Sequence, residues 1–166
     1  MLLEFDRTAS VVPASSVVPN DPSRCHAARG NHHTPQAHAV PDLIGRRVLV
    51  LDDDPLAAII ATLDLEDAGA SFALVHCAAS ALRELDRAAR DGAPYDAAVL
   101  DVNLGGGETS HPVADRLRAD RVPFVFHTAD REVDARNAPM VSKPAVPGAL
   151  ARALASVIAE HHEIGR

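Results

Sequence analysis

The chain has 166 residues, of which 47% are apolar and only 3% aromatic, so a globular core has to be built mainly from Ala, Val, Leu and Ile. This length accommodates one ordinary domain of roughly 100–150 residues with an extension, which excludes a second full domain. The formal net charge of -7 and the lack of a Lys/Arg cluster argue against direct contact with nucleic acid, because phosphate binding requires a basic patch.

Three features of the sequence predict where the protein resides. Cys25 and Cys77 are far apart and form no disulfide framework, which is typical of a reducing compartment. No apolar stretch reaches the roughly 18–20 residues that span a bilayer. Glu4 and Asp6 stand where a signal peptide carries positive charge. We therefore expect a soluble, cytoplasmic protein that does not bind membranes.

Residues 1–42 mix Pro, Ser, Ala, His and Asn without the period of a helix or a strand. Such a segment cannot bury enough apolar surface to offset the entropy lost on ordering, so we expect a disordered N-terminal tail. The folded domain is expected over residues 43–162, with no output domain after it.

The first unit of this domain is a strand followed by a helix. Residues 47–51 form a continuous apolar run, as in a strand buried on both faces of a parallel sheet. After the acidic residues 52–54, Asp54 can cap a helix, Pro55 can occupy its first turn, and Gly69 ends it. The large apolar residues of this helix recur at the spacing of one helical face: Leu56, Ile59, Ile60 and Leu63.

The alternation of strand and helix then repeats. Further strands are predicted at 71–75, 97–100, 123–126 and 140–142, and further helices at about 80–90, at 112–119 and from Pro147 onwards. Five strands that alternate with helices predict an α/β domain with right-handed crossovers and helices on both faces of the sheet.

Some details of these helices also follow from the sequence. The second helix is expected to turn Leu82, Leu85 and Ala89 inward, and the last one carries the apolar residues Leu150, Leu154, Val157 and Ile158. Residues 129–139 are charged and contain Pro139, so this connection is expected to be a loop or a single turn.

Polar side chains follow four of the predicted strands. Asp52 and Asp53 follow the first, Asp101 the third, Thr128 the fourth and Lys143 the fifth. Because the carboxyl ends of parallel strands converge, we expect these groups to form one site. Three carboxylates would repel one another unless a cation neutralises them, and an oxygen-only ligand set suits Mg²⁺. With Lys143 and Thr128, this site could hold a phosphoryl group on the Asp101 carboxylate.

The sequence segments that carry these groups resemble the receiver domain of two-component response regulators. They are Val-Leu-Val-Leu-Asp-Asp-Asp-Pro at 48–55, Ala-Val-Leu-Asp-Val-Asn-Leu at 98–104, Phe-His-Thr-Ala at 126–129 and Val-Ser-Lys-Pro at 141–144. The resemblance covers about residues 45–160. It implies a flavodoxin-like fold with strand order 2-1-3-4-5 and a fourth helix that is short or missing.

The resemblance also implies a role for each site residue. It makes Asp101 the phosphoacceptor, and Mg²⁺ would be held by Asp52, Asp53, Asp101 and the backbone carbonyl of Asn103. Lys143 matches the lysine before a proline, and Thr128 matches the switch hydroxyl. Ala129 stands where a backbone amide contacts the phosphoryl group. The implied partner is a histidine kinase or a histidine phosphotransfer protein, and the sequence leaves dimer formation open.

The chain is also similar to stand-alone receivers of the "FAT GUY" type found in alphaproteobacteria, but it lacks their relay aromatics. Met140 stands where receivers carry Tyr or Phe, and Ala129 and Arg131 replace the Gly and Tyr of that signature. Residues 105–107 are three glycines without the Lys-Ser/Thr of a phosphate loop, and are expected to give backbone freedom beside Asp101.

We therefore expect a single-domain response regulator that is not an enzyme beyond self-catalysed phosphotransfer and autodephosphorylation. It would signal by protein contact or by onward phosphotransfer. The alternative is a receiver-like interaction module that works without phosphorylation. A haloacid-dehalogenase-like phosphatase built on Asp52 and Asp54 is disfavoured, because that motif has Thr or Val where this chain has Leu56.

Overall fold

A computed structural model describes residues 42–129 and 138–164. The predicted disordered tail lies almost entirely outside these residues, and so does most of the connection predicted over 129–139. Within the described part of the chain, no helix is both long and apolar enough to cross a bilayer.

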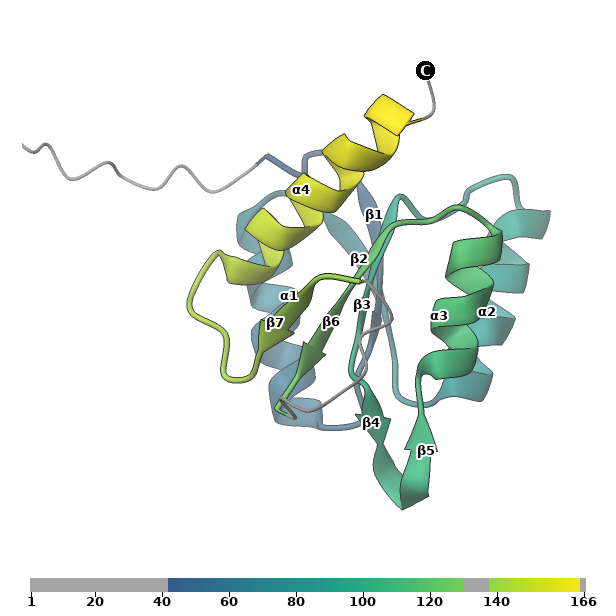
Figure 1. Cartoon of the computed structure of the whole chain (residues 1–166), viewed down its shortest axis with the longest axis vertical. Coiled ribbons are helices and arrows are strands. Elements are labelled where there is room, and N and C mark those ends of the chain that lie inside the picture. The colour runs from purple at the N-terminus through teal and green to yellow at the C-terminus, as the bar shows by residue number, and fades with distance from the viewer. Residues whose placement is uncertain (1–41, 130–137, 165–166) are drawn as a thin grey trace, which may run out of the picture. The chain divides into compact units, whose positions relative to one another are not determined.

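The fold is built on a five-stranded parallel sheet, which confirms the predicted architecture (Figure 1). The strand order β2-β1-β3-β6-β7 is the expected order 2-1-3-4-5. The strands are β1 (Arg47–Leu51), β2 (Ser71–Val75), β3 (Ala97–Leu100), β6 (Phe124–Thr128) and β7 (Met140–Ser142). Strand β6 continues to Thr128, two residues beyond the predicted end.

Four helices among the described residues cover the two faces of this sheet. One face is covered by α1 (Pro55–Asp67) and α4 (Ala149–Ile164), and the other by α2 (Ala78–Arg90) and α3 (His111–Ala119) (Figure 1). Strand β3 is buried along its whole length, as expected for a parallel strand between two helical layers. The sheet therefore separates two apolar clusters, one under each pair of helices.

Helix α1 begins as predicted but turns its large apolar residues outward. The Asp54 side chain accepts hydrogen bonds from the backbone N–H groups of Leu56 and Ala57, and Pro55 is the first helical residue. The face toward the sheet and α4 is instead made of Ala58, Ala61, Thr62 and Leu65. The predicted apolar face is 45–67% exposed: Leu56, Ile59, Ile60 and Leu63. Small side chains let α1 pack closely, so its large residues remain at the surface.

The buried faces of α2 and α4 agree with the prediction at every position but one. In α2, Leu85 is buried and Leu82 is half-buried, whereas Ala89 is exposed. Ala81 and Ala88 are buried together with Leu85, so the inward face of the helix passes through Ala88 and not through Ala89. In α4 all the predicted apolar positions are buried: Leu150, Leu154, Val157 and Ile158.

The glycine-rich segment after β3 forms a small hairpin (Figure 1). Strands β4 (Asn103–Leu104) and β5 (Glu108–Thr109) pair antiparallel around the three glycines 105–107. Gly106 and Gly107 have φ values of 74° and 82°, which other residues rarely adopt. Here the glycines give the expected backbone freedom.

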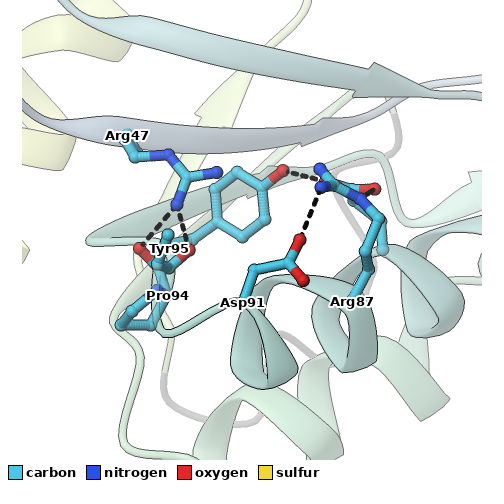
Figure 2. A network of polar contacts seen from close by, with 7 residues as sticks. Arg47, Arg87, Asp91, Pro94 and Tyr95 are labelled. Atoms are coloured by element: carbon cyan, nitrogen blue, oxygen red, sulfur yellow. Dashed lines mark hydrogen bonds and ion pairs between the residues drawn. The ribbon is translucent and has the colours of Figure 1, made fainter.

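A network of polar contacts joins α2 to Arg47, the first residue of β1. Figure 2 shows the side chains of this network. The Arg47 guanidinium donates to the carbonyl of Pro94 and lies 4.8 Å from the centre of the Tyr95 ring. The Tyr95 hydroxyl donates to Glu84, which also binds Arg87. Hydrogen bonds from Arg87 and then Tyr95 lower the pKa of Glu84 to about 2, so this carboxylate stays ionised.

A carboxylate on α1 holds the first turn of α4. Asp64 accepts hydrogen bonds from the backbone N–H groups of Gly148, Leu150 (3.0 Å) and Ala151 (3.3 Å). These are donors that a helix start leaves without an intrahelical partner, and the negative charge also suits the helix dipole. Asp64 thus acts as a capping residue that comes from a different helix.

Replacement of this cap tests its contribution to stability. We expect Asp64→Ala to lower the free energy of unfolding by about 1–2 kcal/mol, because the amides of the first α4 turn lose their acceptor. Urea denaturation followed by circular dichroism measures the change. Asp67→Asn, an exposed carboxylate on the same helix, is the control and should remain within about 0.5 kcal/mol of the wild type. Equal stabilities for Asp64→Ala and the control would contradict the capping role.

Candidate functional site

The carboxyl ends of four neighbouring strands bring the predicted site residues together. The backbone N–H of Asp101 donates to the carbonyl of Leu51 at 2.7 Å, which joins the end of β3 to the end of β1. The backbone N–H of Lys143 donates to the carbonyl of Thr128 at 2.9 Å, which joins the segment after β7 to the end of β6. Sheet register therefore places the site residues, as the sequence predicted from topology.

Three carboxylates form the centre of the site. Asp52, Asp53 and Asp101 each contribute one oxygen, and these oxygens lie within 4.8 Å of one another. Asp52 is 2% exposed and Asp101 is 8% exposed. A cluster of this kind is costly to bury unless a positive charge offsets the repulsion.

Lys143 supplies one such charge. Its Nζ lies 2.7 Å from Oδ2 of Asp52 and 2.6 Å from Oδ2 of Asp101. Burial by itself lowers the pKa of Lys143, but the hydrogen bonds to Asp101 and Asp52 outweigh it, so the pKa is raised and the ammonium stays charged. Burial raises the pKa of Asp52, against the opposing effect of Lys143 and of the Asp54 backbone N–H.

The donor set fits a divalent cation. Three carboxylates and one ammonium leave an excess of two negative charges when the acids are ionised. Grouped carboxylate oxygens are the ligands that Mg²⁺ and similar hard ions prefer. Asp52, Asp53 and Asp101 could therefore hold such an ion.

The remaining predicted residues lie around this centre. Thr128 is the last residue of β6 and is buried, and the exposed Ala129 follows it directly. Asn103 begins β4, two residues after Asp101. Met140, at the start of β7, is 39% exposed. Arg131 lies outside the described residues.

Sequence reasoning missed two contacts at the site and one buried residue beside it. A ring nitrogen of His76 lies 2.9 Å from the carbonyl oxygen of Asp52. The backbone N–H of Gly105 donates to Oδ2 of Asp53 at 2.8 Å. His127 is buried one residue before Thr128. The two contacts join residues that are 24 and 52 positions apart, so no local sequence pattern could reveal them.

Solved structures show what this arrangement is similar to. SdrG from Sphingomonas melonis Fr1 shares 37% identity over 68% of this chain and 96% of its own, with a TM-score of 0.58. The signal receiver domain of a modulated diguanylate cyclase from Desulfovibrio desulfuricans G20 shares 26% identity over 71% of this chain and 97% of its own, with a TM-score of 0.59. This protein belongs to the response regulator receiver family.

A more distant neighbour shares the receiver fold. The response regulator PhyR from Brucella abortus superimposes with a TM-score of 0.64 at 19% identity, and the match covers 76% of this receiver and 52% of PhyR. No family model and no curated protein sequence matches the chain. The assignment therefore rests on the solved structures, and on the site residues that this receiver carries at its strand ends.

His127 is an unusual residue for the interior of this receiver. It is 2% exposed, and neither ring nitrogen has a hydrogen-bond partner among the described residues. Burial, and then the nearby Lys143 ammonium, lower its pKa from 6.5 to about 4, against the opposing charges of Asp101 and Asp64. The imidazole is therefore neutral at physiological pH.

This depressed pKa predicts an acid sensitivity. Between pH 6.5 and 4 the unfolded chain binds a proton at His127 that the folded chain does not, so stability falls as the pH falls through this window, by on the order of 3 kcal/mol. Urea denaturation at several pH values with EDTA present measures the slope. His127→Leu should flatten it, and an unchanged slope in this variant would contradict the assignment.

Proposed function

We propose that this receiver accepts a phosphoryl group on Asp101 from the phosphohistidine of a histidine kinase or a histidine phosphotransfer protein. The observation that carries the proposal is the position of Lys143, whose ammonium lies within 2.7 Å of both Asp52 and Asp101 at the rim of a three-carboxylate cluster. A lysine that only stabilised the surface would have no reason to be buried between two acids.

The proposed transfer is a displacement at phosphorus. A carboxylate oxygen of Asp101 forms a bond to phosphorus as the bond between phosphorus and the donor imidazole nitrogen breaks, and the imidazole leaves with that electron pair. Lys143, the Thr128 hydroxyl and the Ala129 backbone amide would bind the phosphoryl oxygens. Mg²⁺, held by Asp52, Asp53, Asp101 and the carbonyl of Asn103, would supply charge neutralisation.

The exposed face of α1 is suited to dock the phosphodonor. Its side chains Leu56, Ile59, Ile60 and Leu63 have the spacing by which one helix packs against another. A groove of about 190 Å³ continues this face between α1 and the loop before α4, where Val146 is 66% exposed. Because α1 starts directly after the acidic residues of the site, a helix docked there would bring its histidine close to Asp101.

The wider role proposed is that of a cytoplasmic signalling protein rather than an enzyme, with output through protein contacts or onward phosphotransfer. A second candidate, a receiver that binds partners without being phosphorylated, is favoured by Met140. This residue, 39% exposed, occupies the position of the aromatic that receivers use to transmit phosphorylation.

Labelling with a small phosphodonor separates the two candidates. With acetyl phosphate and Mg²⁺ we expect an alkali-labile acyl phosphate that does not form in Asp101→Asn or when EDTA is present from the start, because both the acceptor and the cation are required. Phosphate-affinity gel electrophoresis measures the modified fraction. Asp91→Asn, which alters an exposed carboxylate in a surface ion pair, is the control and should label normally. Label that persists in Asp101→Asn would overturn the proposal.

The docking surface has its own test. Ile59→Ser should lower kcat/KM for transfer from a cognate phosphohistidine protein by at least tenfold, because a central apolar contact of the interface is lost. Labelling by acetyl phosphate, which needs no docking, should not change. Glu66→Ser, also exposed on α1 but outside the apolar face, is the control. Equal effects of both substitutions would rule out this face.

A further inference from the structure

One contact of the site comes from the β4–β5 hairpin. The backbone N–H of Gly105 donates to Oδ2 of Asp53 at 2.8 Å. Lys143 binds the other two carboxylates of the cluster, Asp52 and Asp101, and does not bind Asp53. Among the described residues, the Gly105 amide is the one hydrogen-bond donor to the Asp53 side chain. We infer that Gly105 is a positioning residue that orients Asp53 and thereby sets the affinity of the site for its cation.

The hairpin is anchored firmly enough to fix this amide. Leu104, directly before Gly105, is 4% exposed and packs in the core cluster under α2 and α3. It pairs with Glu108 across the hairpin, and Asn103 pairs with Thr109. On the far side, the backbone N–H of Ser110 donates to the carbonyl of Val102 at 3.1 Å. The Gly105 N–H is therefore held in place from both ends of the hairpin.

A hydrogen bond to one oxygen affects how the carboxylate binds a cation. It fixes the plane of the Asp53 carboxylate beside Asp52 and Asp101, so less side-chain freedom is lost when an ion binds. It also offsets part of the repulsion within the cluster before an ion arrives. Outer contacts that orient metal ligands in this way typically change metal affinity by about 10–100-fold.

Glycine is needed at this position for a different reason than at its neighbours. Gly106 and Gly107 have positive φ values, whereas Gly105 does not. A Cβ atom on Gly105 would instead lie 3.0 Å from Oδ2 of Asp53, which is tighter than most Cβ contacts, so the carboxylate would have to shift by a few tenths of an ångström. A side chain at 105 is therefore compatible with the backbone but would displace the Asp53 carboxylate. The predicted backbone freedom applies to Gly106 and Gly107, and close approach explains Gly105.

Cation binding by the full-length protein tests this inference, which rests on the metal site of the proposed function. Isothermal titration with MgCl₂ should show Gly105→Ala binding at least tenfold more weakly than the wild type. Glu108→Ala, on the opposite hairpin strand, is the control and should bind like the wild type. Melting temperatures measured in EDTA check that both variants are folded.

A double-mutant cycle distinguishes positioning from a general effect on structure. Asp53→Asn removes the carboxylate that Gly105 orients, so adding Gly105→Ala in that background should weaken Mg²⁺ binding by less than twofold. If the wild type binds no Mg²⁺, the metal site of the proposed function is wrong. If the wild type binds and Gly105→Ala binds equally well, only the inference about Gly105 is wrong. A tenfold loss that persists in the Asp53→Asn background, or that Glu108→Ala shares, would also overturn it.

Discussion

The contact of the Lys143 ammonium with both Asp52 and Asp101 is the interaction on which the rest of the site depends. Asp52 and Asp101 are buried at the ends of adjacent strands, where their carboxylates would repel each other. The lysine that offsets this repulsion follows the edge strand β7. Its backbone is held by the carbonyl of Thr128. The ammonium offsets only part of the acidic charge, so the three carboxylates remain attractive to a divalent cation.

Much of this arrangement follows from the sequence because topology alone brings the ends of parallel strands together. Asp52, Asp101 and Lys143 each follow an apolar run, and no side-chain detail was needed to predict that they meet. The outward face of α1 could not be predicted in the same way. Spacing shows that Ile59 and Leu63 share a face, but Ala58 and Leu65 share one too, and which face is buried depends on how closely the helix packs. The bond from Gly105 to Asp53 depends on tertiary packing.

This receiver has no aromatic residue at the two relay positions, 131 and 140, but aromatic rings do contact one another along β6. Phe126 and Phe124 lie on the same face of the strand, with ring centres 5.4 Å apart in an edge-to-face arrangement. His111, the first residue of α3, approaches Phe126 edge-on at 6.3 Å, and the Arg118 guanidinium lies 5.0 Å from the ring of Phe124. These contacts connect the strand that ends in Thr128 to α3. In this receiver the packing between β6 and α3 is thus richer in aromatic contacts than the surface at Met140.

The capping contact of Asp64 joins two helices that lie far apart in the sequence, α1 and α4. Asp64 belongs to α1, whose outer face is the proposed docking surface, and its carboxylate holds the first turn of α4. That turn begins a few residues after Lys143. The Asp64 carboxylate therefore joins α1 to the start of α4, and only a short stretch of chain separates that start from Lys143. In the proposed function, a partner helix on the outer face of α1 would therefore contact the same helix that holds the chain just beyond Lys143 in place.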